Sequence, residues 1–354
     1  MPWKPANGTN SKGNPMMRSV RLRNPASHSK HLVKSLQHPS GLFSASKASV
    51  KTGYDKAWLR DNIYESLALE ATGEKKALLK TYHALLDLLL KHEYKIDHVI
   101  KQKPKHAYQY IHARFHPHTF DEFHEEWGNK QNDAVGALLF KIGDLDKKGY
   151  RVIRNLNDVR ILQKLVMYLQ SVEYWHDEDN GVWEENAEVH ASSVGACVAG
   201  LKAISHKVIV PPSLIEKGEK ALSELLPNES KTKKVDLALL SLIYPYNVVN
   251  DEMKLRILHN VERKLVRKRG VLRYLGDMYY NKGGEAEWTM GFPWLAKIYK
   301  DLGFKAKYEH YMKKTYEVMN EKGELPELYF ANSDEHNENS PLGWSQAMFV
   351  VALR

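Results

Sequence analysis

The sequence of 354 residues has a single cysteine, Cys197, and no long apolar run. One cysteine cannot form an intramolecular disulfide and suits a reducing compartment, so we expect a cytoplasmic location. The longest apolar stretch, residues 84–90, contains Asp87 and is far shorter than the roughly 18–20 residues of a membrane-spanning helix. The two absences argue against a disulfide-stapled secreted domain and against an integral membrane protein.

Acidic residues are absent from the first 54 positions, which hold nine Lys and Arg residues. The whole chain has 52 Lys plus Arg against 43 Asp plus Glu, a formal net charge of +9. Residues 55–354 therefore hold 43 residues of each sign and are formally neutral. A neutral body argues against a basic nucleic-acid-binding domain, although a basic leader can contact a polyanion. We expect no nucleic-acid partner.

Residues 1–29 are predicted to form a basic, disordered tail. Gly, Asn, Ser and Pro dominate this segment, and Trp3 is its one aromatic residue. It lacks the continuous apolar core of a secretory signal. Its acid-free composition, with Arg and Ser, also fits an organelle transit peptide, but a solvated tail is the simpler interpretation. Residues 30–354 are predicted to form one domain.

Beyond residue 30, apolar residues recur at helical spacing nearly throughout. Strand patterns are few, at 207–210 and 271–274, and the absence of a βαβ repeat argues against Rossmann and TIM folds. Twelve helices can pair into an (α/α)6 barrel, and this all-α, single-domain fold is our prediction. The predicted helices are 30–38, 58–72, 74–92, 130–143, 156–174, 191–204, 212–225, 233–242, 248–266, 285–301, 305–320 and 341–353.

Long loops rich in aromatic and acidic residues precede the second, fourth, sixth, tenth and twelfth predicted helices. This pattern indicates that the even-numbered helices form the inner ring, because the loops that enter the inner helices open at one end of such a barrel. Sites built from several loops at one mouth are the usual way in which a barrel carries chemistry.

The first of these loops combines Tyr54 and Trp58 with the adjacent pair Arg60 and Asp61. Aromatic faces stack on the C–H surface of a sugar ring, and Arg and Asp side chains hydrogen-bond paired hydroxyls. The same residues also fit a helix start with Asp61 near the cap and Trp58 in the core. The loop by itself leaves both interpretations open.

The second loop contains four histidines, including His112 and His116, and ends near Trp127 and Gly128. His-x₃-His spacing would place two ligands on one helix face, but Pro117 disfavours a helix there and no intervening Glu completes a metalloprotease motif. We interpret this segment as a polar loop rather than a metal site.

Two further loops hold candidate catalytic carboxylates. Glu184 stands between Trp183 and Glu185, and a carboxyl group beside an aromatic wall and a like charge is suited to act as a general acid. Glu327 follows Pro326 ahead of the last predicted inner helix. Both carboxylates also fit exposed acidic turns, and the aromatic residues that follow Arg273 also fit packing at a rim.

Together the five loops resemble those of glycoside hydrolase family 15, the glucoamylase family, and the glucoamylase-like domain at the start of phosphorylase kinase regulatory subunits. The resemblance covers roughly residues 40–350. It rests on Trp58-Leu59-Arg60-Asp61-Asn62, Trp127-Gly128 with Gln131 and Asp133, Trp183-Glu184-Glu185, Arg273-Tyr274 with Asp277, Leu325-Pro326-Glu327, and Pro341-Leu342-Gly343-Trp344-Ser345.

The resemblance implies inverting, exo-acting hydrolysis that releases glucose from the non-reducing end of short α-linked gluco-oligosaccharides. Glu184 would be the general acid and Glu327 the general base, roughly 6.5–9.5 Å apart as in inverting pairs. Arg60 and Asp61 would bind hydroxyls of the terminal glucose, and the implied reaction requires no metal or organic cofactor. The implied substrate-binding residues are Tyr54, Trp58, Arg60, Asp61, Trp127, Trp183, Glu185 and Arg273.

Two departures from the family pattern leave the linkage, α-1,4 or α-1,6, open. Asn129-Lys130-Gln131 stands where the family has Arg-Pro-Gln, and Leu328 stands where it has Gln. The alternative function is a non-catalytic, sugar-sensing or regulatory barrel like that of the phosphorylase kinase subunits. The presence of both Glu184 and Glu327 favours an enzyme.

Overall fold

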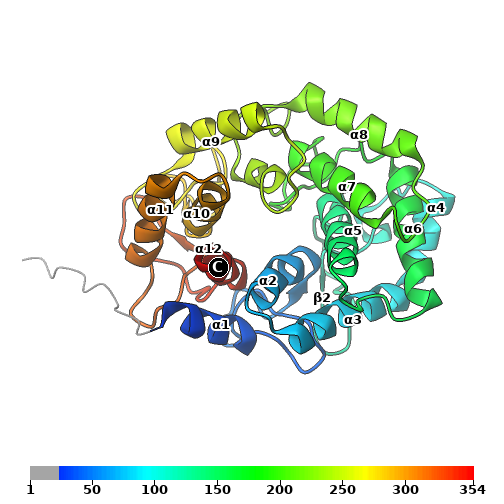
Figure 1. Cartoon of the computed structure of the whole chain (residues 1–354), viewed down its shortest axis with the longest axis horizontal. Coiled ribbons are helices and arrows are strands. Elements are labelled where there is room, and N and C mark those ends of the chain that lie inside the picture. The colour runs from blue at the N-terminus through cyan, green and yellow to red at the C-terminus, as the bar shows by residue number, and fades with distance from the viewer. Residues whose placement is uncertain (1–23) are drawn as a thin grey trace, which may run out of the picture.

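Helices are arranged as an inner ring surrounded by an outer ring in a computed structural model of the chain, which describes residues 24–354 (Figure 1). Each inner helix contacts the next, and the last packs against the first, so the ring is closed. The inner helices of the described chain are α2 (Leu59–Ala71), α5 (Asn132–Lys147), α7 (Ala191–Ile204), the 3₁₀ helix η2 (Leu237–Leu242), α10 (Gly291–Asp301) and α12 (Gly343–Leu353).

The outer helices alternate with the inner ones along the chain, which confirms the predicted all-α (α/α)6 barrel. The outer set of the described chain consists of α1 (Pro25–Ser35), α3 (Lys75–Lys91), α6 (Leu156–Val172), α8 (Pro212–Leu225), α9 (Asp251–Leu265) and α11 (Lys305–Glu317). The second, fourth, sixth, eighth, tenth and twelfth predicted helices are the inner ones, as the loop pattern indicated.

Several elements differ from the sequence-based prediction. Helix α4 (Glu93–Lys101) was not predicted; it follows α3 almost directly and packs on the outer face of α6. The eighth helix is the short 3₁₀ helix η2, in whose first turn the backbone N–H of Ala238 donates to the Asp236 side chain. Neither predicted strand forms: residues 207–210 lie in and after the turn that ends α7, and residues 271–274 make only isolated bridges.

The first helix begins earlier than predicted. Asn24 caps α1 by accepting a hydrogen bond from the backbone N–H of Ser27, and Pro25 occupies the first turn, where its missing N–H costs nothing. Ser29 is buried and accepts a hydrogen bond from Gln346 of α12. Residues 25–29 therefore belong to the helical barrel rather than to the predicted tail, and residues 1–23 of that tail lie outside the described residues.

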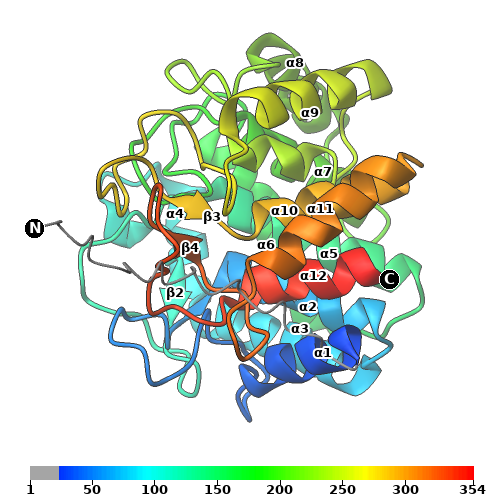
Figure 2. The same ribbon diagram turned by 90° about the vertical axis from the view of Figure 1, so that its left-hand side faces the viewer.

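The strands of the described chain are two residues long and tie loops together at one end of the barrel. The strand β1 (Ala57–Trp58) pairs antiparallel with β2 (Arg114–Phe115), and β3 (Glu287–Trp288) pairs antiparallel with β4 (Leu328–Tyr329). In the side view of Figure 2, β2, β3 and β4 lie at one end of the molecule and the C-terminal end of α12 at the other. The paired loops form the mouth of the barrel.

The inner helices α5 and α7 approach each other closely because glycines stand at their contact. A Cβ atom on Gly200 would lie 2.4 Å from the carbonyl oxygen of Gly136, and one on Gly136 would lie 2.5 Å from the carbonyl carbon of Ala196. Both distances are below van der Waals contact with backbone atoms, which cannot move aside as a side chain can. Across residues 24–354, none of the helices has the length and apolar content needed to cross a bilayer.

Candidate active site

All ten predicted site residues line one cavity of about 390 Å³ at the mouth of the barrel. They come from loops that are far apart in the sequence, and closure of the helical ring brings them together. The remaining residues of its wall, which the prediction did not include, are Ala45, Thr52, Val182, Tyr279, Trp288, Met290, Leu342 and Trp344.

The Glu184 carboxylate is held by donors from two other loops. Its Oε2 accepts hydrogen bonds from the indole nitrogens of Trp58 at 3.1 Å and Trp127 at 2.6 Å, and its Oε1 lies 2.9 Å from Nη2 of Arg60. The φ of Glu184 is 61°, a left-handed conformation that a non-glycine residue adopts at a cost. Gly128 lies against this turn, because a Cβ atom there would lie 3.0 Å from the Glu184 carbonyl oxygen.

The Arg60 guanidinium is shared between Glu184 and the first turn of α5. Its Nη1 donates to Oε1 of Gln131 at 3.0 Å and forms an ion pair with Oδ2 of Asp133 at 2.9 Å. The Arg60 and Asp133 side chains are both buried. This arrangement fixes the orientation of the guanidinium, since its planar donors are matched to acceptors on either side.

Asp61 faces the same cavity, and no other side chain of residues 24–354 donates a hydrogen bond to its carboxylate. Burial raises the pKa of Asp61 to about 7; the neighbouring Arg60 lowers this pKa and Glu184 raises it further. Asp61 is thus a buried acceptor whose oxygens are available to a ligand.

Glu327 is fully buried at the opposite loop, between Pro326 and β4. It accepts hydrogen bonds from the Tyr54 hydroxyl at 2.5 Å and from Nδ2 of Asn339 at 2.7 Å, and Asn337 also donates to it. Burial raises the pKa of Glu327, and these hydrogen bonds oppose the rise. The two asparagines were not among the predicted site residues, although Asn339 stands directly before the Ser-Pro pair that precedes α12.

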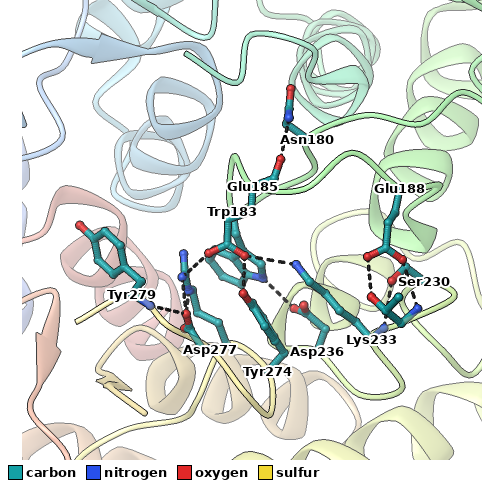
Figure 3. A network of polar contacts seen from close by, with 12 residues as sticks. Asn180, Trp183, Glu185, Glu188, Ser230, Lys233, Asp236, Tyr274, Asp277 and Tyr279 are labelled. Carbon is teal, nitrogen blue, oxygen red and sulfur yellow. Dashed lines mark hydrogen bonds and ion pairs between the residues drawn. The ribbon is translucent and has the colours of Figure 1, made fainter. Parts of the chain in front are cut away.

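Glu185 turns to a different set of partners from its neighbour Glu184. Its carboxylate lies 2.5 Å from Nη2 of Arg273 and 3.4 Å from Nζ of Lys233, and it accepts a hydrogen bond from Tyr274. Figure 3 shows Glu185 with Tyr274 and Lys233 pointing toward it. Two cations therefore balance Glu185. Sequence reasoning missed Lys233, which lies outside the five loops considered.

Aromatic rings form two parts of the cavity wall. Trp58 lies 5.5 Å from Tyr54 and 6.5 Å from Trp127 between ring centroids. On the other part, Trp183 lies 5.7 Å from Trp288, and its indole nitrogen donates to Asp236 at 2.8 Å, as Figure 3 shows. These faces can stack on the C–H surfaces of a bound ring.

Of the four histidines of the second loop, only His112 is buried. His112 is buried with its Nε2 3.8 Å from Oε2 of Glu122, and burial lowers the pKa of His112 to about 3. In the part of the chain that the structure describes, no group of three or more His, Cys, Asp or Glu side chains is arranged to hold a metal ion.

The fold is an (α/α)6 barrel (Figure 1), and its mouth has buried carboxylates and walls of aromatic rings. Residues 25–206, slightly more than half of the chain, match the family Glycosyl hydrolases family 15, and the chain belongs to this family.

The curated relatives that match the chain include regulatory subunits of a kinase. The chain is 27% identical over 374 residues to the probable phosphorylase b kinase regulatory subunit alpha of Caenorhabditis elegans, covering 83% of this chain. It is 29% identical over 303 residues to the liver isoform of that subunit from Mus musculus, covering 73% of this chain. The alignments span 30% and 24% of those relatives' lengths.

Solved structures with this fold include glycosidases. A wild-type glycosidase superposes with a TM-score of 0.79 at 19% identity, covering 93% of this chain and 95% of that chain. The glucoamylase of Hormoconis resinae gives a TM-score of 0.64 at 14% identity, covering 93% of this chain and 72% of that chain. At these identities the likeness shows the shared fold.

Proposed function

We propose that this protein is an exo-acting, inverting hydrolase that releases glucose from the non-reducing end of short α-linked gluco-oligosaccharides. The observation that carries the proposal is the presence of Glu184 and Glu327 in the wall of one cavity with the Arg60–Asp61 pair. Family membership and the aromatic wall support it. The single buried cysteine, Cys197, is in keeping with a cytoplasmic enzyme.

In the proposed reaction Glu184, protonated, donates its proton to the glycosidic oxygen as the bond to the anomeric carbon breaks. Glu327, ionised, takes a proton from a water molecule that attacks that carbon from the opposite face of the ring. Tyr54, Asn337 and Asn339 donate hydrogen bonds to Glu327 and so favour its ionised form.

The terminal sugar is proposed to bind between Asp61 and Arg60 on one side and the tryptophan rings on the other. Asp61 supplies a free acceptor for hydroxyl groups, and Arg60 supplies donors. Glu185 and Arg273 lie together and are proposed to bind the leaving-group sugar. The cavity, about 390 Å³, lies within the roughly 300–1,000 Å³ of ligand sites.

Substitution of either carboxylate tests the proposal directly. The wild-type protein is assayed for glucose release from a panel of α-linked disaccharides, maltose and isomaltose among them. Glu184→Gln and Glu327→Gln should each lower kcat at least about 100-fold, since each removes a proton-transfer group. Glu178→Gln, on an exposed side chain before the same loop, is the matched control. Unchanged turnover in both carboxylate variants would overturn the assignment.

The anomer formed first tests the mechanism. Attack by water opposite the leaving group converts an α-glucoside to β-glucose. Proton NMR recorded during the first minutes of hydrolysis should therefore show the β-anomer, followed by slow mutarotation. Initial release of α-glucose would rule out inversion.

A second candidate function is regulatory, because the curated relatives are regulatory subunits of phosphorylase b kinase. A barrel of this kind would bind a sugar without cleaving it. Calorimetric binding of an oligosaccharide by a wild-type protein that hydrolyses no member of the panel would favour the regulatory function over the enzymatic one.

A further inference from the structure

A chain of two hydrogen bonds connects Thr52 to the buried Glu327 through the amide of Asn339. The Thr52 hydroxyl donates to Oδ1 of Asn339 at 2.5 Å, and Nδ2 of Asn339 donates to Oε2 of Glu327 at 2.7 Å. Asn339 and Glu327 are fully buried, whereas Thr52 lies in the cavity wall. The three residues thus form a hydroxyl–amide–carboxylate relay that starts at the cavity surface.

The orientation of the Asn339 amide matters because its Nδ2 group donates hydrogen bonds whereas its Oδ1 atom accepts them. With Nδ2 toward Glu327 the amide donates to the carboxylate, whereas a flipped amide would place its oxygen against the carboxylate oxygens. The backbone of Asn339 is fixed separately, since its carbonyl accepts from the N–H of Glu327 at 2.8 Å. A hydroxyl that donates to Oδ1 favours the productive orientation and polarises the N–H groups.

Comparison with the second amide on Glu327 singles out Thr52. Asn337 also donates its Nδ2 to Oε2 of Glu327, but its buried Oδ1 has no hydrogen-bond partner within residues 24–354. Of the two amides that contact the carboxylate, Asn339 is the one whose Oδ1 accepts a hydrogen bond from another side chain of the described chain, while the Asn337 side chain contacts Tyr280.

We propose that Thr52 is a positioning residue that orients the Asn339 amide toward Glu327. The proposal rests on the proposed function of Glu327 as general base. The same loops are also joined by the Lys47–Glu324 ion pair and by a hydrogen bond at 2.9 Å from the Ser46 hydroxyl to the Pro341 carbonyl. Loss of the Thr52 hydroxyl therefore alters the relay while other contacts still hold the loops together.

Two variants distinguish the effect of the Thr52 hydroxyl on kcat from the effect of side-chain packing. Thr52→Val keeps the branched side chain without the hydroxyl, and Thr52→Ser keeps the hydroxyl. Thr52→Val should lower kcat about five- to ten-fold with a smaller change in KM, since a charge-assisted hydrogen bond to the base is weakened. Thr52→Ser should recover most of the loss. Equal kcat values for the two variants would overturn the proposal.

The pH dependence of kcat distinguishes the relay from a packing effect, because a change in packing alone would not shift it. A weakened Asn339 donor to the ionised carboxylate raises the pKa of Glu327, so the acid limb of kcat should shift upward by about half a pH unit in Thr52→Val and not in Thr52→Ser. The other titratable or charged groups that act on Glu327 are Tyr54, Arg273 and, more remotely, Asp61, Tyr279 and Tyr280, and all are unchanged in both variants.

A measurement without turnover distinguishes failure of the relay from failure of the proposed function. The carboxyl carbon of Glu327 is titrated by ¹³C NMR, with Glu327→Gln to assign its signal. A higher midpoint in Thr52→Val than in wild type and Thr52→Ser supports the relay even if the wild type cleaves no α-glucoside. Identical midpoints in all three proteins would refute it even in an active enzyme.

Discussion

At the scale of single residues, Asp61 differs from the other carboxylates of the cavity. Glu184, Glu185 and Glu327 each accept hydrogen bonds from three side chains, whereas Asp61 receives none from another side chain of the described chain. Burial without such donors disfavours the charged form, and the pKa of Asp61 rises to about 7. A bound sugar can supply the donors that no other side chain gives the ionised carboxylate.

Sugar binding should therefore weaken as the pH falls through 7. Asp61 becomes protonated over this range, and a neutral carboxyl is a weaker acceptor for sugar hydroxyls than a carboxylate. Titration calorimetry with glucose should give a Kd that rises about five- to ten-fold from pH 8 to pH 6. Asp61→Asn should bind more weakly at pH 8 and lose this dependence; an unchanged pH dependence in the variant would contradict the assignment.

At the scale of elements, the contact of α5 with α7 depends on glycines. Gly136 and Gly200 bring backbone against backbone, and Gly143 faces α7 in the same way, because a Cβ atom on Gly143 would lie 2.5 Å from the Ala203 carbonyl. Alanine is the better helix former by about 1 kcal/mol, so propensity alone would favour Gly→Ala. The close backbone contact opposes it.

Gly200→Ala should lower the free energy of unfolding. Overpacking against immobile backbone costs about 1–3 kcal/mol, which exceeds the gain of about 1 kcal/mol in helix propensity. Urea denaturation measures the difference. Lys202→Ala, on an exposed position of the same helix, should change the free energy of unfolding by less than about 0.5 kcal/mol. A Gly200→Ala protein as stable as the wild type would show that the helices can separate.

At the scale of the whole molecule, most of the excess charge precedes the site in the sequence. The excess of positive charge belongs to the first 54 residues, and seven of the nine Lys and Arg residues of that segment precede Ala45, the first residue of the cavity wall. The proposed substrates are neutral sugars, which long-range electrostatic fields do not steer. The basic N-terminal segment is therefore not needed to attract them.

Deletion of residues 1–23 should leave kcat/KM for the best disaccharide within about two-fold of the full chain, because no charge on the substrate is available for steering. The same deletion removes five basic residues and should lower retention on a heparin column. Steady-state kinetics and elution salt concentration measure the two effects. A ten-fold loss of kcat/KM would place this segment at the site.

The helices and their inner or outer position could be read from the sequence because both signals are local. Apolar spacing marks each helix, and aromatic and acidic loops precede the inner ones. Helix α4 was missed because its packing against α6 is a tertiary contact. The apolar run Leu237–Leu242 has the spacing of an α-helix, but it forms a 3₁₀ helix.

The sequence by itself determined the barrel class, the order of its helices and ten residues of the cavity wall, since these depend on local patterns and on family motifs. Only the tertiary structure decided the partners of those residues. Thr52 and Asn339, for example, are 287 positions apart, and polar residues in loops are too common to pair by inspection. Closure of the helical ring places α12 against α2, and that contact brings the Asn339 loop to Thr52.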